Sequence, residues 1–240
     1  MIVHTNPLFS VYFGNAEDDL DPDQYSDIPP GTPLLSIAPY NKLTKLMPIN
    51  ALTFPKQVHG DQGLIVTLPL EHPPFSQPAD YLATKEKRLG IGVMTADCLP
   101  IVLYDSMHHA AAIVHAGWKG SVKEITAKAV TTMQEQFGTR LAQLRIFFGP
   151  SIKACCYKVS DDFVTKLEGF PFAQEVLHRE QEGLMFDLPL FNRLQLEDIG
   201  VPKEAFKLQY NFCTACDQRY CSYRRSGRAA CRQMTVITLK

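Results

Sequence analysis

Apolar residues gather in short runs along the middle of the chain, and the lengths of these runs suit β-strands. Three such runs follow one another, over residues 89–94, 100–104 and 110–114. Apolar runs of this length between turn signals are typical of strands that are buried on both faces of a sheet. Weaker alternation over residues 1–14 predicts an edge hairpin that turns near Asn6-Pro7. Further strands are expected over residues 51–58, 63–68, 144–148, 205–210 and 234–239.

The clearest helical pattern follows Trp118. Ser121 and Glu124 stand three residues apart, as in a capping box, so a helix is expected to begin at Ser121. Apolar residues then recur at helical spacing as far as Phe137, and Gly138 supplies the left-handed conformation that often ends a helix. Two shorter helices are expected over residues 161–167, after Ser160, and 190–199, after Pro189.

Polar and proline-rich segments separate these elements. Loops are expected over residues 15–33, 69–78 and 213–232. Residues 59–62 form a tight polar turn that joins the two predicted strands on either side of it. Strands outnumber long helices, and short links join several of them. The pattern predicts a single α+β domain over residues 1–240, with mixed or antiparallel sheets that helices cover on one side.

Composition narrows the classes of function. The net charge of −1 excludes a general nucleic-acid or membrane-surface role, because the sequence lacks a basic excess or a basic block. The longest apolar runs are too short for a membrane-spanning helix, and residues 1–14 lack the features of a secretory signal. The cytoplasm is therefore the expected compartment. Seven cysteines, an odd number with Cys155 next to Cys156, do not suggest the disulfide framework of a secreted protein.

Three residues that come where apolar runs meet polar turns could form a metal site. His59, Cys98 and His115 are a donor set that suits Zn²⁺, and three protein ligands leave a fourth position open. Their wide spacing alone favours structural roles, with His59 as a turn residue, Cys98 as a core thiol and His115 as a strand-end histidine. A third interpretation makes Cys98 a nucleophile with His115 as its base. Asp97 joins either site only if the backbone turns there, since strand neighbours point to opposite faces.

Two further patterns lie near the end of the chain. Cys213-x2-Cys216-x4-Cys221 resembles half of a zinc ribbon, but only Cys231 follows it, and a closed site usually needs four ligands. Arginines at positions 224, 225, 228 and 232 form a local cluster that suits phosphate or carboxylate, or alternatively a solvated basic loop.

Several stretches together resemble the laccase-domain family, also described as multicopper polyphenol oxidases or as laccase-domain purine nucleoside phosphorylases. They occur in the family's order over about residues 55–240. The stretches are Gln57-Val58-His59-Gly60, Ala79-Asp80, Thr95-Ala96-Asp97-Cys98-Leu99-Pro100, His115-Ala116-Gly117-Trp118-Lys119-Gly120, Gly149-Pro150-Ser151-Ile152, Cys155-Cys156-Tyr157, Phe186-Asp187-Leu188, Cys213-Thr214 and Ser222-Tyr223-Arg224-Arg225-Ser226-Gly227 with Arg232.

The resemblance implies an α/β/β layered sandwich like that of cysteine hydrolases of the cytotoxic-necrotizing-factor type. It also implies a zinc ion bound by His59, Cys98 and His115. The family is associated with phosphorolysis of adenosine, inosine and guanosine, cleavage of methylthioadenosine, and deamination of adenosine. Some bacterial members are linked to editing of peptidoglycan precursors. Copper is less attractive here, because a multicopper oxidase needs many more histidines than seven, of which His108 and His109 are adjacent.

The chain departs from the family in its N-terminal part. The family's Ser-Thr-Arg-x-Gly-Gly stretch corresponds here to residues 11–15, and its later Asn-Arg stretch to residues 39–42, so residues 1–50 are divergent. Lys119 stands where an arginine is usual, and Lys158 where a glutamate is usual. These differences concern the substrate side of the pocket and leave the three metal ligands intact.

These observations predict a zinc-dependent enzyme that acts on purine nucleosides with phosphate. His59, Cys98 and His115 would hold the metal, and Asp97 would transfer a proton or orient a ligand. Residues expected to bind substrate are Gln57, Lys119, Arg224, Arg225 and Arg232. The alternatives are a thiol hydrolase or amidase acting on peptidoglycan precursors, a copper polyphenol oxidase, and a nucleoside-binding protein with impaired catalysis. The sequence does not decide whether the chain forms a homo-oligomer.

Overall fold

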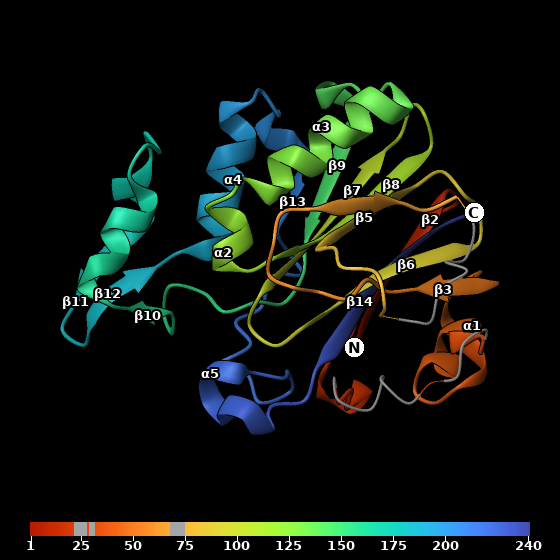
Figure 1. The fold of residues 1–240 in the computed structure, drawn as a ribbon, viewed down its shortest axis with the longest axis horizontal. Helices are drawn as coiled ribbons and strands as arrows, with labels where there is room; N and C mark the ends of the chain where they lie inside the picture. Colours follow the sequence, from red (N-terminus) through yellow and green to blue (C-terminus); the bar gives the residue numbers. More distant parts are fainter. Residues whose placement is uncertain (22–27, 29–31, 68–74) are drawn as a thin grey trace.

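Two large β-sheets form the body of the protein in the computed structural model, which describes residues 1–21, 28, 32–67 and 75–240. The strand order is β1-β2-β14-β6-β3 in the five-stranded sheet and β13-β9-β7-β8-β5-β4 in the six-stranded sheet (Figure 1). The strands are β1 (Ile2–Thr5), β2 (Phe9–Phe13), β3 (Ala51–Thr53), β4 (Gly63–Ile65), β5 (Tyr81–Thr84), β6 (Leu89–Thr95), β7 (Leu99–Asp105), β8 (Ala110–Ala116), β9 (Leu144–Phe148), β13 (Phe206–Lys207) and β14 (Gln233–Leu239).

The six-stranded sheet is buried on both faces, which explains the continuous apolar runs. Along β8, Ala112 and Val114 face the core shared with the helices α3 (Ile125–Phe137) and α4 (Leu188–Asp198). Ala111 and Ile113 face the core shared with the five-stranded sheet. Successive side chains of a strand point to opposite faces, so both faces need apolar residues. The predicted α/β/β sandwich is confirmed, with the long helices on one side.

Side chains and short helices also pack on the outer face of the five-stranded sheet. The sequence had predicted helices on one side only. β14 lies between β2 and β6 and runs antiparallel to both, and it sends Met234 and Val236 outward. Short helical segments, including residues 34–36, 40–42 and α1 (Leu43–Leu46), pack on these side chains. Helical cover is therefore present on both outer faces, although only the six-stranded sheet carries long helices.

The start of the long helix differs from the prediction. α3 begins at Ile125, after a separate short helix, α2 (Trp118–Ser121), and Glu124 has a left-handed φ of 60°. Ser121 does not cap α3, because its hydroxyl exchanges hydrogen bonds with the buried Asn192 of α4. The capping-box pattern was wrong because this contact between helices takes the hydroxyl away from the backbone.

The hairpin predicted over residues 51–68 is also wrong. β3 pairs in parallel with β6 in one sheet, whereas β4 pairs in parallel with β5 in the other. Residues 54–62 therefore cross between the two sheets and do not close a hairpin. The crossing matters for the site, because it brings His59 to the boundary between the sheets.

Other predictions agree in part. The hairpin over residues 1–14 is confirmed, with Thr5 opposite Ser10. The strand expected over 205–210 shrinks to β13, and residues 161–167 form a 3₁₀ helix that the Ser160 side chain does not cap. The loops expected over 15–33 and 69–78 lie partly outside the described residues.

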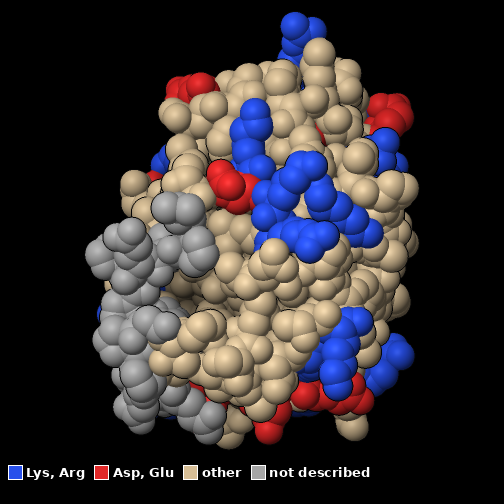
Figure 2. Space-filling model, turned by 90° about the vertical axis from the view of Figure 1, so that its right-hand side faces the viewer, with Lys and Arg blue, Asp and Glu red and all other residues tan. Residues whose placement is uncertain are grey.

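A small sheet and the surface charge complete the description. β10 (Lys158–Val159), β12 (Gly183–Phe186) and β11 (Leu177–Glu180) form a three-stranded sheet at the left of Figure 1. On the face shown in Figure 2, Lys and Arg side chains gather in small groups beside Asp and Glu, with uncharged surface between them. None of the helices among the described residues has the length and apolar character that a bilayer crossing requires.

Candidate metal and substrate site

Three segments meet at one end of the two sheets and bring His59, Cys98 and His115 together. Cys98 lies in the bend between β6 and β7, His115 is in β8, and His59 is in the crossing after β3. The register that pairs Pro100 with His115 sets the thiol beside this imidazole. The potential ligand atoms of the three side chains all lie within 4.8 Å of one another, and the two imidazole rings have centroids 4.7 Å apart.

Asp80 organises this group, and it is buried. One carboxylate oxygen accepts hydrogen bonds from His115 Nδ1 at 2.8 Å and from the backbone N–H of His59 at 3.0 Å. The other oxygen accepts from the N–H groups of Val58 at 3.2 Å and Gly60 at 2.6 Å. Successive N–H groups that converge on an anion form a nest, which explains the left-handed φ of 56° at His59.

Sequence reasoning gave Asp80 no role. The available signal was the Ala79-Asp80 stretch, which was used for the family resemblance and not for chemistry. Burial works against the ionised form of Asp80, but hydrogen bonds from His115 and the backbone outweigh it and lower the pKa of the carboxyl. A carboxylate behind a histidine ligand fixes the tautomer and the ring orientation.

Cys98 and His115 form a charged pair in the metal-free protein. Burial alone would raise the pKa of Cys98, but His115 and His59 lower it to about 6. Burial alone would lower the pKa of His115, but the Cys98 thiolate and Asp80 raise it to about 9. The thiol is therefore ionised near neutral pH, which is the form that binds a metal and the form that attacks as a nucleophile.

The donor set fits a zinc ion. The bond from His115 Nδ1 to Asp80 leaves Nε2 as the ligand atom of this ring. One thiolate and two imidazoles supply three ligands and leave a tetrahedral position open. A side chain at Gly117 would place its Cβ 2.9 Å from Cys98 Sγ and 3.4 Å from the His59 ring. The glycine in the His-Ala-Gly-Trp stretch thus keeps space beside the ligands.

Asp97 is held in the bend just before Cys98. Its φ is 84°, so the backbone does turn at this point, as a shared site requires. One carboxylate oxygen accepts from the Thr214 hydroxyl at 2.6 Å and the other from the backbone N–H of Arg224 at 2.6 Å. Its backbone oxygen accepts from the N–H of Ile152 at 2.9 Å. Asp97 therefore joins three segments of the chain behind the metal ligands.

A cavity of about 770 Å³ opens over these residues, a size typical of small-molecule sites. His59, Cys98 and His115 form part of its wall. The lining also contains the aromatic rings of Trp118, Tyr157 and Tyr223. Its cations are Lys56, Lys119, Arg224 and Arg232. One cavity thus combines soft metal donors, flat rings and positive charge.

Of the five residues predicted to bind substrate, four line the cavity and one does not. Gln57 lines it, although its amide pairs with the backbone N–H and C=O of Met94. Lys119 and Arg232 also line it, and Arg224 stacks its guanidinium 5.3 Å from the centre of the Tyr157 ring. Arg225 lies outside the lining, and its guanidinium donates to the carbonyls of Thr214, Ala215 and Tyr220.

The half zinc ribbon proposed over Cys213, Cys216 and Cys221 is wrong in one member. Cys221 is bonded to Cys231 in a disulfide, which the sequence interpretation did not anticipate. Cys213 and Cys216 instead lie next to Cys155 and Cys156 from an earlier loop. Spacing along the chain could not reveal a partner pair so far away in the sequence.

The comparison with known proteins identifies the family. The model of the multi-copper polyphenol oxidoreductase laccase family matches residues 39–240. The chain belongs to this laccase-domain family. The match extends further toward the N-terminus than the motif stretches recognised in the sequence.

Relatives in this laccase-domain family carry the names of nucleoside enzymes. A purine nucleoside phosphorylase of Clostridium acetobutylicum is 30% identical over 188 residues, which cover 77% of this chain and 75% of that protein. An adenosine deaminase of an unknown prokaryote is 32% identical over 202 residues, or 80% and 76% of the two chains. The purine nucleoside phosphorylase YlmD of Bacillus subtilis is 30% identical over 67% of this chain and only 59% of its own length. The predicted enzyme type is thus confirmed at the level of the family.

Solved structures of the laccase-domain family agree with the fold. The hypothetical protein YfiH of Bacillus licheniformis matches with a TM-score of 0.73 at 29% identity, over 79% of this chain and 74% of that one. The NMB0706 protein of Neisseria meningitidis matches with a TM-score of 0.78 at 21% identity, over 100% and 98% of the chains. The layered sandwich, including its divergent N-terminal part, therefore recurs in a solved structure.

Proposed function

We propose that this chain is a zinc-dependent enzyme of purine nucleosides, active in phosphorolysis and in deamination of adenosine, within a single domain of residues 1–240. One observation carries the proposal: His59, Cys98 and His115 converge within 4.8 Å on the wall of a cavity that also holds aromatic rings and cations. The names of the relatives support the same substrate class. The cytoplasm stays our expectation for its compartment.

The metal ligands and the residues around them have different roles. A zinc ion bound by His59, Cys98 and His115 supplies a Lewis acid with one open coordination position. Asp80 orients the His115 ring and, through three backbone N–H groups, the loop that carries His59. Asp97 accepts hydrogen bonds at both carboxylate oxygens, so we assign it to positioning rather than to proton transfer.

The cavity lining suits a nucleoside and a phosphate. The aromatic side chains of Trp118, Tyr157 and Tyr223 give the lining flat apolar groups that suit a purine ring, with Lys119 over the ring of Trp118 and Arg224 over that of Tyr157. Lys119 and Arg224 offer positive charge for phosphate oxygens, and arginine does so with a planar fork of donors. Lys119, where the family has arginine, supplies a point charge in place of that fork.

The test is incubation of the purified protein with adenosine or inosine, with and without inorganic phosphate. Phosphorolysis consumes phosphate and yields the free base with ribose 1-phosphate, whereas deamination of adenosine yields inosine and ammonia without phosphate. We expect at least one of these products, and we expect Cys98→Ala to lose both turnover and the metal of this site. A Cys98→Ala variant that keeps both would overturn the mechanism.

A thiol hydrolase is the second candidate, because Cys98, His115 and Asp80 also form a nucleophile, a base and an orienting carboxylate. This candidate predicts that alkylation of Cys98 abolishes activity while removal of metal by a chelator does not. The zinc enzyme predicts that both treatments abolish activity and that bound metal slows alkylation. Assay of the same preparation after each treatment separates the two mechanisms.

Copper oxidase chemistry fits the donors less well. Two imidazoles and a thiolate can bind one copper ion, but a multicopper enzyme needs further histidine clusters. Within the described part of the chain, His108 pairs with Asp105, and His109 contacts Tyr104 and the backbone of Lys240. Neither belongs to a group of potential metal ligands there. If the protein binds nucleosides but yields no product, it is instead the binding protein with impaired catalysis.

A further inference from the structure

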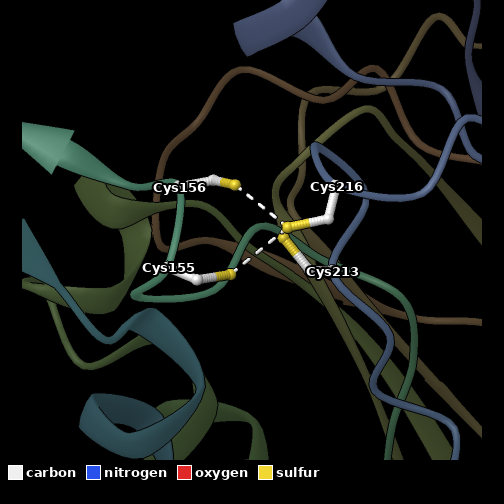
Figure 3. A group of neighbouring side chains, drawn as sticks. All are labelled: Cys155, Cys156, Cys213 and Cys216. Atoms are coloured by element: carbon white, nitrogen blue, oxygen red, sulfur yellow. Dashed lines mark hydrogen bonds between the residues drawn. The ribbon is translucent and has the colours of Figure 1, made fainter.

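Four cysteines form a second group of potential metal ligands, apart from the site described above. Figure 3 shows that Cys155 and Cys156 point from one loop toward Cys213 and Cys216 on another. The Sγ atoms of Cys156 and Cys216 are 3.1 Å apart, and those of Cys155 and Cys216 are 3.5 Å apart. All four sulfurs lie within 4.8 Å of one another, and all four thiols are free.

The two loops are joined by backbone contacts that do not involve sulfur. Ser151 and Cys213 form a parallel bridge. The N–H of Ser151 donates to the carbonyl of Phe212 at 3.0 Å, and the N–H of Thr214 donates to the carbonyl of Ser151 at 3.1 Å. Asn211, which is buried, adds side-chain bonds to Gly149 O and Ser151 Oγ. The cysteines are therefore brought together by the fold itself, so the sulfur positions are preorganised.

Local turns direct the four sulfurs inward. The N–H of Asp217 donates to the carbonyl of Cys213 at 3.1 Å, which closes a turn around Cys213-x2-Cys216. On the other loop, the N–H groups of Cys156 and Tyr157 both donate to the carbonyl of Lys153. The Cys213-x2-Cys216 turn has the spacing that is usual for one half of a closed zinc site, and the adjacent Cys155 and Cys156 supply the other two sulfurs.

We propose that Cys155, Cys156, Cys213 and Cys216 bind one structural Zn²⁺, so that the protein holds a second metal besides the one in the cavity. Zinc–sulfur bonds of about 2.3 Å in a tetrahedron place sulfurs about 3.8 Å apart, which the observed cluster approaches without rearrangement of its loops. Four thiolates without an open position suit a structural ion, and soft sulfur ligands favour zinc over hard cations.

The site has a clear structural consequence for the cavity. Tyr157 follows Cys156 directly and lines the cavity under Arg224. Thr214 follows Cys213 directly and donates its hydroxyl to Asp97. The proposed ion therefore ties the loop whose Tyr157 lies in the cavity wall to the loop whose Thr214 holds the bend before Cys98. It positions this wall and does not touch the substrate.

The test counts metal in the whole protein purified without added chelator. Native mass spectrometry and elemental analysis of the wild type are expected to find two zinc ions per chain. Cys155→Ser with Cys216→Ser, two exposed positions, is expected to keep one, and His59→Ala with His115→Ala is expected to keep the other. The control Cys221→Ser with Cys231→Ser carries the same kind of change in the same region and is expected to keep both.

Several results would overturn the proposal, and they differ from a failure of the nucleoside enzyme. One is a wild-type protein whose only zinc is the ion that the His59→Ala, His115→Ala variant loses. Others are a Cys155→Ser, Cys216→Ser variant with the wild-type metal content, iron in place of zinc, or a disulfide among the four cysteines in unreduced peptide maps. If the cysteine variant does not fold, cobalt substitution of the His59→Ala, His115→Ala protein decides. Strong thiolate-to-cobalt absorption there supports four sulfur ligands, and its absence overturns them.

Discussion

Replacement of Asp80 by asparagine tests whether this buried carboxylate holds the metal ligands in place. Asparagine has nearly the same shape, but one carboxylate oxygen becomes an NH₂ group. In the wild type, each oxygen accepts two hydrogen bonds, one oxygen from His115 and His59, the other from Val58 and Gly60. Whichever way the amide is oriented, two of these donors then face an NH₂ group that cannot accept from them.

The magnitude of the Asp80→Asn effect follows from these contacts. A buried donor left without an acceptor costs about 1–3 kcal/mol. Because Val58, His59 and Gly60 are not buried residues, the low end applies, and the loss of two bonds is expected to lower the free energy of unfolding by about 2 kcal/mol. The loss of a carboxylate behind a histidine ligand typically weakens metal binding by about 10–100-fold. Because the lowered pKa of Asp80 makes its ionised form stabilising, the contribution is present above the ordinary Asp pKa and is lost as the pH falls through the folded-state pKa.

The assay combines urea unfolding of the metal-free protein with competition between the protein and a chelator for zinc. Asp61→Asn is the matched control, because Asp61 lies in the same loop but its carboxylate forms an ion pair with Lys128 at the surface. Exposed pairs of this kind contribute about 0–1 kcal/mol. If Asp80→Asn and Asp61→Asn lose the same stability and bind zinc equally well, Asp80 does not organise the site.

Two further predictions concern the metal site, and a third concerns the pH dependence of stability at the far end of β7. Gly117→Ala should fold but bind zinc at least about tenfold more weakly, because the Cβ of the alanine would lie 2.9 Å from Cys98 Sγ. Competition with a chelator measures the affinity, and a wild-type value would refute this prediction. At about pH 8, zinc binding to this site should release about one proton. Cys98, with a pKa of about 6, is already deprotonated at this pH, whereas His115, with a pKa of about 9, still carries the proton that it must lose to bind the metal. Calorimetry in buffers of different ionisation enthalpy measures the release, and no release would contradict the charged pair. Asp105→Asn should flatten the loss of stability below about pH 4. Burial works against the ionised form of Asp105, but hydrogen bonds from the His108 ring and from the backbone N–H groups of Met107 and His108 outweigh it and lower the pKa of the carboxyl. An unchanged slope in acid unfolding would refute this.

The sequence predicted the central strands well for a physical reason. β7 and β8 are buried on both faces, so their apolar runs are unbroken and their bounds are visible in one dimension. β9 and β14 were also located, although Arg145 interrupts the apolar run of the first and Thr235 and Thr238 interrupt that of the second. Long-range packing removes such signals elsewhere, as at Ser121, whose hydroxyl bonds to Asn192 and not to the first turn of α3.

The turn at residues 59–62 shows why local signals mislead. Glycine and polar residues do mark a change of direction there, but they do not say which strands pair on either side. The buried Asp80 carboxylate accepts hydrogen bonds from the N–H groups of residues 58–60. These bonds fix the segment where it crosses from one sheet to the other. No pattern within the turn itself reveals an acceptor that lies twenty residues away.

The candidate site was predictable where the family motifs cover it and not where distant loops meet. His59, Cys98 and His115 were selected together through the resemblance, since their spacing alone favoured structural roles. The grouping of Cys155 and Cys156 with Cys213 and Cys216 depends on the bridge between Ser151 and Cys213. Spacing rules count ligands within one segment, so Cys221 was assigned to a site that it does not join.

The place of β14 in the five-stranded sheet has a consequence for how this protein is made. β14 separates β2 from β6, and its partner residues Gln233 and Thr95 are more than half of the chain apart. On a ribosome, β2 and β6 therefore emerge long before the strand that joins them, and the sheet cannot close until β14 has been synthesised. Contacts of such long range slow folding and leave strand edges exposed meanwhile. A newly synthesised chain therefore exposes the unpaired edges of β2 and β6 until β14 is available to pair with them.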